Sequence, residues 1–174
     1  MLMEKLHPFS KFPDRIHASS ERPHLLYHQV PEHFAIHGPL PVQLTESVLL
    51  RFYDQSIAVC QGMPDQELMQ TKSMAITPVY SLEPDGPFAV PTGRIFVRFK
   101  EGMKAESQNQ ALASTGYTIT DIPLYAPHTA WVRHQSKDVA SALTNLSGLE
   151  RLSEVVNVEP QMLMKPARRS GPSA

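Results

Sequence analysis

Histidines are the residues of this chain with the most obvious potential for chemistry, because a neutral imidazole is a common zinc ligand. Six of the eight lie in the first quarter of the chain. Two pairs, His24 with His28 and His33 with His37, have the H-x-x-x-H spacing that places both rings on one face of a helix. Pro31 lies between the pairs and no HExxH motif is present, so we expect no metal site and no cofactor here.

Nucleophilic chemistry is not indicated either. The single cysteine, Cys60, lies within an apolar segment without an adjacent basic residue, and we expect its thiol to be a small buried group. The sequence contains no glycine-rich phosphate loop, Cys-x-x-Cys pair or Gly-x-Ser-x-Gly nucleophile motif. We therefore assign no catalytic residues and do not expect an enzyme.

The amino-acid composition limits the kinds of binding partner that we expect. The 16 Lys and Arg residues balance 17 Asp and Glu residues, so no net positive charge attracts nucleic acid or an anionic membrane, and neither is an expected partner. The chain of 174 residues is long enough for one ordinary domain or two small ones. It begins without the apolar run of a signal peptide and contains no apolar stretch of membrane-spanning length, so we expect a cytoplasmic protein.

Prolines divide the chain into segments. Six of the 16 lie between positions 8 and 41, so residues 1–40 are predicted to form an irregular, extended, Pro- and His-rich arm that wraps a surface. Residues 41–92 are predicted to be a small α+β segment that ends in a turn cluster around Pro84-Asp85-Gly86-Pro87. Its expected elements are strands at 47–53, 56–61 and 74–80, with a hairpin between the first two, and a short helix from Pro64-Asp65 to about Lys72.

The region 93–163 has the clearest pattern. In RIFVRFK at 94–100, Ile95, Val97 and Phe99 alternate with basic residues except at Phe96, and this period of two is typical of a half-buried strand. Its other expected elements are a helix at 104–115, strands at 117–122 and 129–134, a helix ending at Gly148 and a strand at 154–159 that stops at Pro160. This βαββαβ order predicts a ferredoxin-like α+β fold, an open-faced antiparallel sheet with two helices on one face.

Two short matches suggest that 41–92 is a degenerate repeat of the region after it. Arg51-Phe52 and Arg98-Phe99 each end an expected strand, and each is followed, after a helix, by a Pro-aliphatic-Tyr triplet. These triplets are Pro78-Val79-Tyr80 and Pro123-Leu124-Tyr125.

A family resemblance covers residues 93 to about 167. GRIFVRFKEGM at 93–103, TAWVRH at 129–134, ALTNLSGLERL at 142–152 and above all VVNVEPQ at 155–161 resemble the propeptides of subtilisin-like serine proteases, of the fervidolysin-like type. Such propeptides are ferredoxin-like chaperones and inhibitors of their protease. The chain contains no Gly-x-Ser-x-Ala motif of that protease, so the resemblance implies a free-standing inhibitor acting in trans.

The resemblance also implies roles for individual residues. Glu159 matches a carboxylate that caps the N-terminus of a protease surface helix, and neutral Gln161 matches the second such carboxylate. The tail 164–174 would enter the protease cleft as an added strand, with Met164, Lys165, Pro166 and Ala167 in the four subsites before the scissile bond.

Two other uses of such a sheet stay open. A single-stranded RNA-binding module needs outward aromatic and basic residues on the central strands, and Phe96 and Arg98 fit that requirement, although the RNP-type spacing is missing. A regulatory domain that senses a ligand or dimerises through the open face is the other alternative. Trp131 is expected in the core or on a sheet face.

Overall fold

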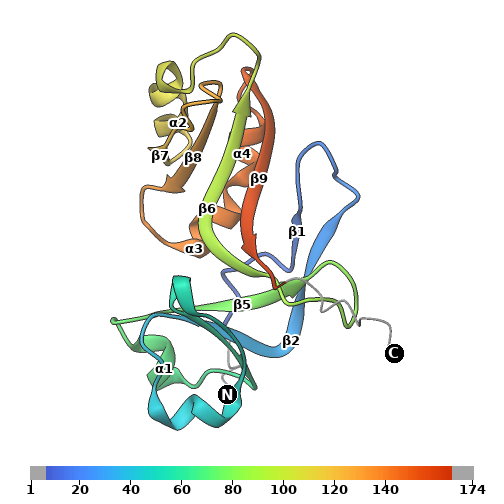
Figure 1. Ribbon diagram of the computed structural model, residues 1–174, viewed down its shortest axis with the longest axis vertical. Coiled ribbons are helices and arrows are strands. Elements are labelled where there is room, and N and C mark those ends of the chain that lie inside the picture. Colours follow the sequence, from blue (N-terminus) through green and yellow to red (C-terminus); the bar gives the residue numbers. More distant parts are fainter. Residues whose placement is uncertain (1–6, 166–174) are drawn as a thin grey trace, which may run out of the picture.

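Two antiparallel β-sheets with short helices make up the part of the chain that the computed structural model describes, residues 7–165 (Figure 1). The expected α+β class is thus confirmed. The first sheet contains β1 (Arg15–His17), β2 (Leu26–His37), β3 (Val48–Phe52), β4 (Ile57–Gln61) and β5 (Ala75–Ser81). Its order is β1-β2-β4-β3, and β5 also pairs with β2.

The long strand β2 organises the first sheet, which corrects the prediction of an irregular arm. It pairs with β1, β4 and β5. Pro31, which argued against a strand, lies where the β2–β5 register shifts between Gln29 and Phe34, and the adjacent Glu32 has a φ of 57°. A bulge of this kind accommodates a proline within a strand because the ladder is locally interrupted.

The local elements of the first sheet follow their sequence signals. A short 3-10 turn, η2 (Tyr53–Gln55), joins β3 to β4, which confirms the expected hairpin. Helix α1 (Gln66–Gln70) begins after Asp65, whose carboxylate accepts a 2.7 Å hydrogen bond from the backbone N–H of Leu68. A further 3-10 segment, η1 (Val42–Ser47), leads into β3.

The second sheet has the order β7-β8-β6-β9, with every pair antiparallel. Its strands are β6 (Val90–Phe99), β7 (Tyr117–Asp121), β8 (Thr129–His134) and β9 (Val155–Leu163). Between β6 and β7 the chain forms η3 (Ala105–Gln108) and α2 (Asn109–Ser114), and between β8 and β9 it forms α3 (Val139–Thr144) and α4 (Leu146–Glu150).

One face of the second sheet is buried under these helices. Ile95, Val97 and Phe99 are at most 1% exposed and belong to the same apolar cluster as Leu112 of α2 and Leu149 of α4, which confirms the predicted alternation. In Figure 1, α4 lies behind β6 and β9. The opposite side of the sheet, turned away from the helices, is called the outer face below.

The last strand is longer than predicted. We expected it to stop at Pro160, but β9 continues to Leu163, which pairs with Val90. Proline is tolerated because β9 is an edge strand, where one side of the backbone has no ladder partner. The register also shifts between Pro91 and Ile95 of the facing strand.

The two matched triplets have different structures, so they do not support a repeat. Val79 and Tyr80 are fully buried in β5. Leu124 and Tyr125, in contrast, are 100% and 91% exposed in the loop between β7 and β8.

Candidate functional site

The outer face carries the aromatic and charged side chains of the second sheet. Antiparallel register arranges them in rows that cross the strands. The middle row contains Asp121, Trp131, Phe96 and Glu159, one from each strand in the order β7, β8, β6, β9. The row on one side contains Thr118, Arg133 and Arg94, and the row on the other side contains Thr129, Arg98 and Asn157.

An aromatic pair lies at the centre of the outer face. The rings of Phe96 and Trp131 pack edge to face, with centroids 5.3 Å apart and an interplanar angle of 61°. Both side chains are partly exposed. A shallow hollow of about 370 Å³ lies beside them, and Glu159, Gln161 and Met162 of β9 contribute to its lining. Such a hollow, rigid and partly apolar, suits a side chain projecting from a partner.

Three arginines flank the aromatic pair. The guanidinium carbon of Arg94 lies 4.5 Å from the centroid of the Trp131 ring, within cation–π range. Arg133 is the direct cross-strand neighbour of Arg94. Within residues 7–165, neither of these two arginines takes part in an ion pair, whereas Arg98 pairs with Glu21.

The loop between β1 and β2 covers one end of the outer face. The side-chain oxygen of buried Asn157 accepts hydrogen bonds from the Ser19 hydroxyl at 2.9 Å and the Ser20 hydroxyl at 3.0 Å. The backbone N–H of Ser20 donates to the carbonyl of Val158, and the N–H of Val158 donates to the Ser20 hydroxyl. We call residues 19–21 the clamp; it satisfies part of the free edge of β9. Figure 1 shows the β1–β2 hairpin beside β9.

The residues singled out from the sequence lie along β9 and just beyond it. Glu159 and Gln161 are on the outer face, and both already bond to their own chain. Glu159 accepts a 2.8 Å hydrogen bond from the amide of Asn157, and the carbonyl of the Gln161 amide accepts one of 2.8 Å from the Thr92 hydroxyl. Met164 and Lys165 directly follow β9 and are exposed. Pro166 and Ala167 lie outside the described residues.

The histidines considered for zinc do not converge. His33 and His37 are four residues apart on β2, which places them about 13 Å apart along a strand. His37 bonds through Nε2 to the buried Thr77 hydroxyl at 3.0 Å, and burial lowers its pKa to about 4. Within residues 7–165 we find no group of three or more His, Cys, Asp or Glu side chains arranged to hold a metal ion.

Cys60 is fully buried in β4, as expected from its apolar segment. Burial raises the pKa of its thiol, an effect that nearby Arg51 partly opposes. A raised thiol pKa lowers the thiolate population on which nucleophilic chemistry depends.

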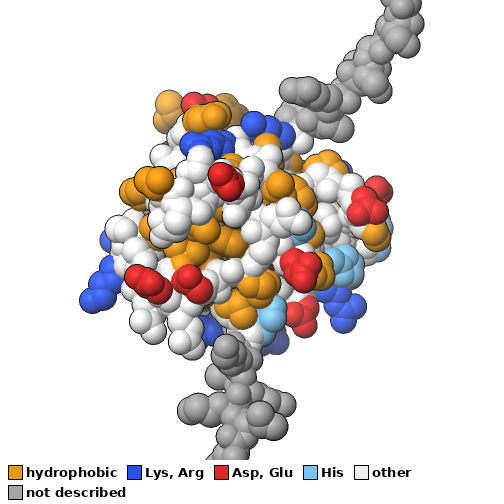
Figure 2. All heavy atoms as spheres, turned by 90° about the horizontal axis from the view of Figure 1, so that it is seen from below, with side chains coloured by type: hydrophobic (Ala, Val, Ile, Leu, Met, Phe, Trp, Pro, Cys, Tyr) orange, Lys and Arg blue, Asp and Glu red, His pale blue; other side chains and the backbone are white. Residues whose placement is uncertain are grey.

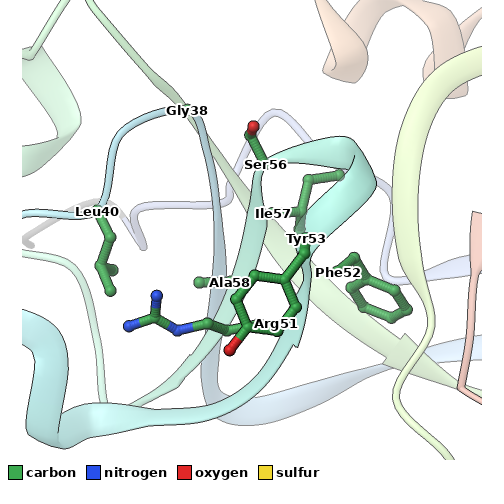
Figure 3. Close-up of a pocket in the computed structure, with 8 residues that line it drawn as sticks. All are labelled: Gly38, Leu40, Arg51, Phe52, Tyr53, Ser56, Ile57 and Ala58. Carbon is green, nitrogen blue, oxygen red and sulfur yellow. The ribbon is translucent and has the colours of Figure 1, made fainter.

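The first sheet has hollows of its own. One of about 200 Å³ is formed by the β3–β4 hairpin, where Arg51 extends toward Leu40, the Tyr53 ring lies 6.0 Å from the guanidinium carbon, and the Ser56 hydroxyl points away (Figure 3). A larger one lies between η1 and α1 and includes Phe34, Leu68 and Met74. Figure 2, which views this end of the molecule, shows hydrophobic side chains at its centre and acidic ones around them. Neither hollow contains a cluster of chemically active groups.

Comparisons with protein-family models, with curated proteins and with solved structures found no match to this chain. Within residues 7–165, no helix is long and apolar enough to cross a membrane.

Sequence reasoning placed Phe96 and Arg98 on the outer face but did not bring Phe96 against Trp131 or Arg94 against Arg133. The sequence does indicate the face on which each side chain lies, because successive side chains of a strand point to opposite faces of the sheet. The register between β6 and β8, which decides which residues are opposite, cannot be obtained from either strand alone.

Proposed function

We propose that this protein is an inhibitor of a subtilisin-like serine protease, and that the second sheet is a ferredoxin-like docking domain whose outer face binds the protease surface. The observation that carries the proposal is the aromatic pair of Phe96 and Trp131, partly exposed at the centre of a sheet that is buried on its other face. Aromatic side chains at the centre of a flat, rigid surface are common anchors of protein interfaces.

The strand arrangement supports this assignment. Four antiparallel strands in the order β7-β8-β6-β9, with helical segments after the first and third strands in the chain, fit the ferredoxin-like arrangement that the propeptide resemblance implies. The helices pack on the inner face, so a partner can reach the outer one.

The proposed route of the tail starts at the end of β9. The strand ends at Leu163, and exposed Met164 and Lys165 lead the chain away from the sheet. From there the segment from Met164 to Ala167 would add a strand to the protease cleft, held by main-chain hydrogen bonds, with the carbonyl of Ala167 at the oxyanion hole. Glu159 has a second carboxylate oxygen with which to cap a protease helix.

The experiment is an inhibition assay with subtilisin and, as a control, trypsin, which has the same catalytic triad on a different fold. We expect inhibition of subtilisin alone. Phe96→Ser should weaken it about tenfold or more, which corresponds to the loss of one interface anchor. Tyr53→Ser, which removes a 77% exposed aromatic from the first sheet, is the matched control and should inhibit like the wild type. Equal inhibition of both proteases, or of neither, would refute the proposal.

A truncated variant separates the contribution of the outer face to inhibition from that of the tail. Removing residues 166–174 leaves every described strand intact, since β9 ends at Leu163; a cut after Pro160 would remove part of β9. The truncated protein should still bind subtilisin through the outer face but should let it cleave small peptide substrates. Full inhibition by the truncated form would show that the tail plays no part in blocking the cleft.

A further inference from the structure

Two arginines are cross-strand neighbours on the outer face, and no acidic side chain between residues 7 and 165 pairs with either. Arg94 of β6 and Arg133 of β8 are direct cross-strand neighbours. Like charges at such positions destabilise a sheet. Neither arginine forms an ion pair with any residue between 7 and 165. Arg98, four residues further along β6 on the same face, is neutralised by Glu21 of the clamp.

The Trp131 ring positions the Arg94 side chain. Its guanidinium lies over the Trp131 ring, 4.5 Å from the centroid. A guanidinium that stacks on an aromatic ring contacts it with its flat side, so its N–H groups, which lie in the plane of the guanidinium, stay free for other partners. Those N–H groups form the fork that recognises a carboxylate through two parallel hydrogen bonds.

The Arg133 side chain lies beside a glycine. Gly93 has a φ of +84°, and a Cβ at this position would lie 3.3 Å from a methyl group of Val139 and 3.8 Å from Nη1 of Arg133. A larger residue would therefore be strained by the backbone conformation and would press on Val139, whereas 3.8 Å to Nη1 is an ordinary van der Waals distance. Nη1 of Arg133 thus lies beside Gly93 and Val139, the first residue of α3.

We propose that Arg94 and Arg133 bind the carboxylate of an acidic side chain on the surface of a partner protein, while an apolar neighbour of that acid packs on Phe96 and Trp131. The proposal deepens the proposed function, on which it rests for the identity of the partner. The carboxylate would supply the counter-charge that residues 7–165 do not provide, and the aromatic pair would exclude water from one side of the contact.

The charges at the edges of the outer face favour an acidic protein over a nucleic acid. Asp121 is the cross-strand neighbour of Trp131, and Glu159 is that of Phe96, so the aromatic row has a carboxylate at each end. A polyphosphate backbone crossing this row would meet both carboxylates, whereas a single carboxylate beside Arg94 and Arg133 would meet neither. The net charge of −1 gives no general attraction for nucleic acid.

The site has a built-in probe, because Trp131 is the only tryptophan of the chain. We would titrate the full chain with the peptide acetyl-Leu-Asp-Leu-Asp-Leu-amide and with its isosteric Asn counterpart, following Trp131 fluorescence. The acidic peptide should bind about tenfold more tightly, since charge-assisted hydrogen bonds are the stronger ones. Raising the salt concentration from 50 mM to 500 mM should reduce this preference, because the contact is partly exposed. Oligouridylate serves as the nucleic-acid probe.

Variants then assign the effect to the two arginines. Because Arg94→Gln alters the environment of Trp131 directly, binding to the variants is measured by fluorescence anisotropy of a labelled acidic peptide. Arg94→Gln and Arg133→Gln should each remove most of the preference for the acidic peptide. Arg94→Lys should keep only part of it, because an ammonium group lacks the planar fork. Lys137→Gln, which removes an exposed positive charge from the turn after β8, is the matched control and should bind like the wild type.

Three results would overturn the inference: equal binding of both peptides, binding of neither, or tighter binding of oligouridylate, which would indicate a nucleic-acid surface. The subtilisin assay is read separately. If the acidic peptide binds but subtilisin is not inhibited, the carboxylate site stands and the protease is the wrong partner. If subtilisin is inhibited and Arg94→Gln inhibits as strongly as the wild type, the protease assignment stands and the carboxylate site is wrong.

Discussion

The first sheet is buried on both faces, and the second sheet is buried on one. In β2 the consecutive residues Phe34, Ala35 and Ile36 are at most 2% exposed. Phe34 and Ile36 belong to an apolar cluster with Leu68 of α1, while Ala35 belongs to a different cluster on the other side, with Val59, Val79 and Val90. In β6, by contrast, buried and partly exposed residues alternate over most of the strand.

This difference indicates which sheet is available for binding. At the centre of the first sheet, the side chains on both faces are packed against other parts of the molecule. Replacing a side chain there therefore lowers the free energy of unfolding. On the second sheet, the side chains of the inner face pack against the helices. The outer face can therefore carry Arg94, Trp131 and Arg133, whose arrangement is not needed for packing. The residues that hold the fold together and the residues of the proposed interface are thus largely separate.

The largest expected effect comes from a matched pair of phenylalanines. Phe34→Ala, in the two-sided sheet, should lower the free energy of unfolding by about 3–5 kcal/mol, because it opens a cavity in a fully packed site. Phe96→Ala, on the outer face, should cost only about 1 kcal/mol. Urea denaturation followed by circular dichroism measures both. Similar costs for the two variants would show that the outer face is as much a part of the packing as β2.

A second prediction tests the polar part of the two-sided sheet through pH. Burial lowers the pKa of His37 from 6.5 to about 4, so below pH 6.5 the unfolded chain takes up a proton that the folded chain does not. The free energy of unfolding is therefore unaffected by His37 above pH 6.5 and falls by about 3 kcal/mol as the pH is lowered toward 4.

His37→Gln is the control for this pH dependence, since an amide can keep the hydrogen bond to Thr77 but does not titrate. Urea denaturation at pH 7.0 and pH 4.5 should show a smaller loss for the variant than for the wild type. The other histidines are common to both proteins, so their contributions cancel in the comparison. An equal loss would mean that His37 accepts its proton without unfolding.

The same contrast explains what could be predicted from the sequence. A one-sided strand shows its burial as alternation, so β6 and its inner residues were predictable from RIFVRFK. A two-sided strand shows no period, and the prolines between positions 8 and 41, of which Pro31 lies in β2, suggested an irregular segment. The bulge that accommodates Pro31 depends on pairing with β5, which lies more than forty residues further along the chain.

Contacts between distant segments account for the rest of the candidate site. Asn157 is bonded to the clamp across 136 residues or more, and neither sequence segment has a pattern that predicts the other. The position of Trp131 against Phe96 and Arg94 likewise depends on register. Glu159 and Gln161 were assigned to the end of the last strand, which was expected to stop at Pro160, whereas β9 continues beyond both.

The smallest expected effect concerns the contact that joins the two regions, the ion pair of Glu21 and Arg98. Both side chains are more than a third exposed, so solvent screens the pair, and Glu21→Gln should lower the free energy of unfolding by less than about 1 kcal/mol. The loss should shrink in 1 M NaCl, where the wild type loses most of the same interaction.

Asn157→Ala is the informative comparison, because Asn157 is buried and its removal leaves the Ser19 and Ser20 hydroxyls without their acceptor. It should cost about 2 kcal/mol and should speed hydrogen exchange at the Ser20 amide, whose acceptor is the carbonyl of Val158. If Glu21→Gln were the more costly of the two, the charge pair rather than the buried amide would hold the clamp on β9. Salt would then detach the clamp and uncover the Arg98 end of the outer face.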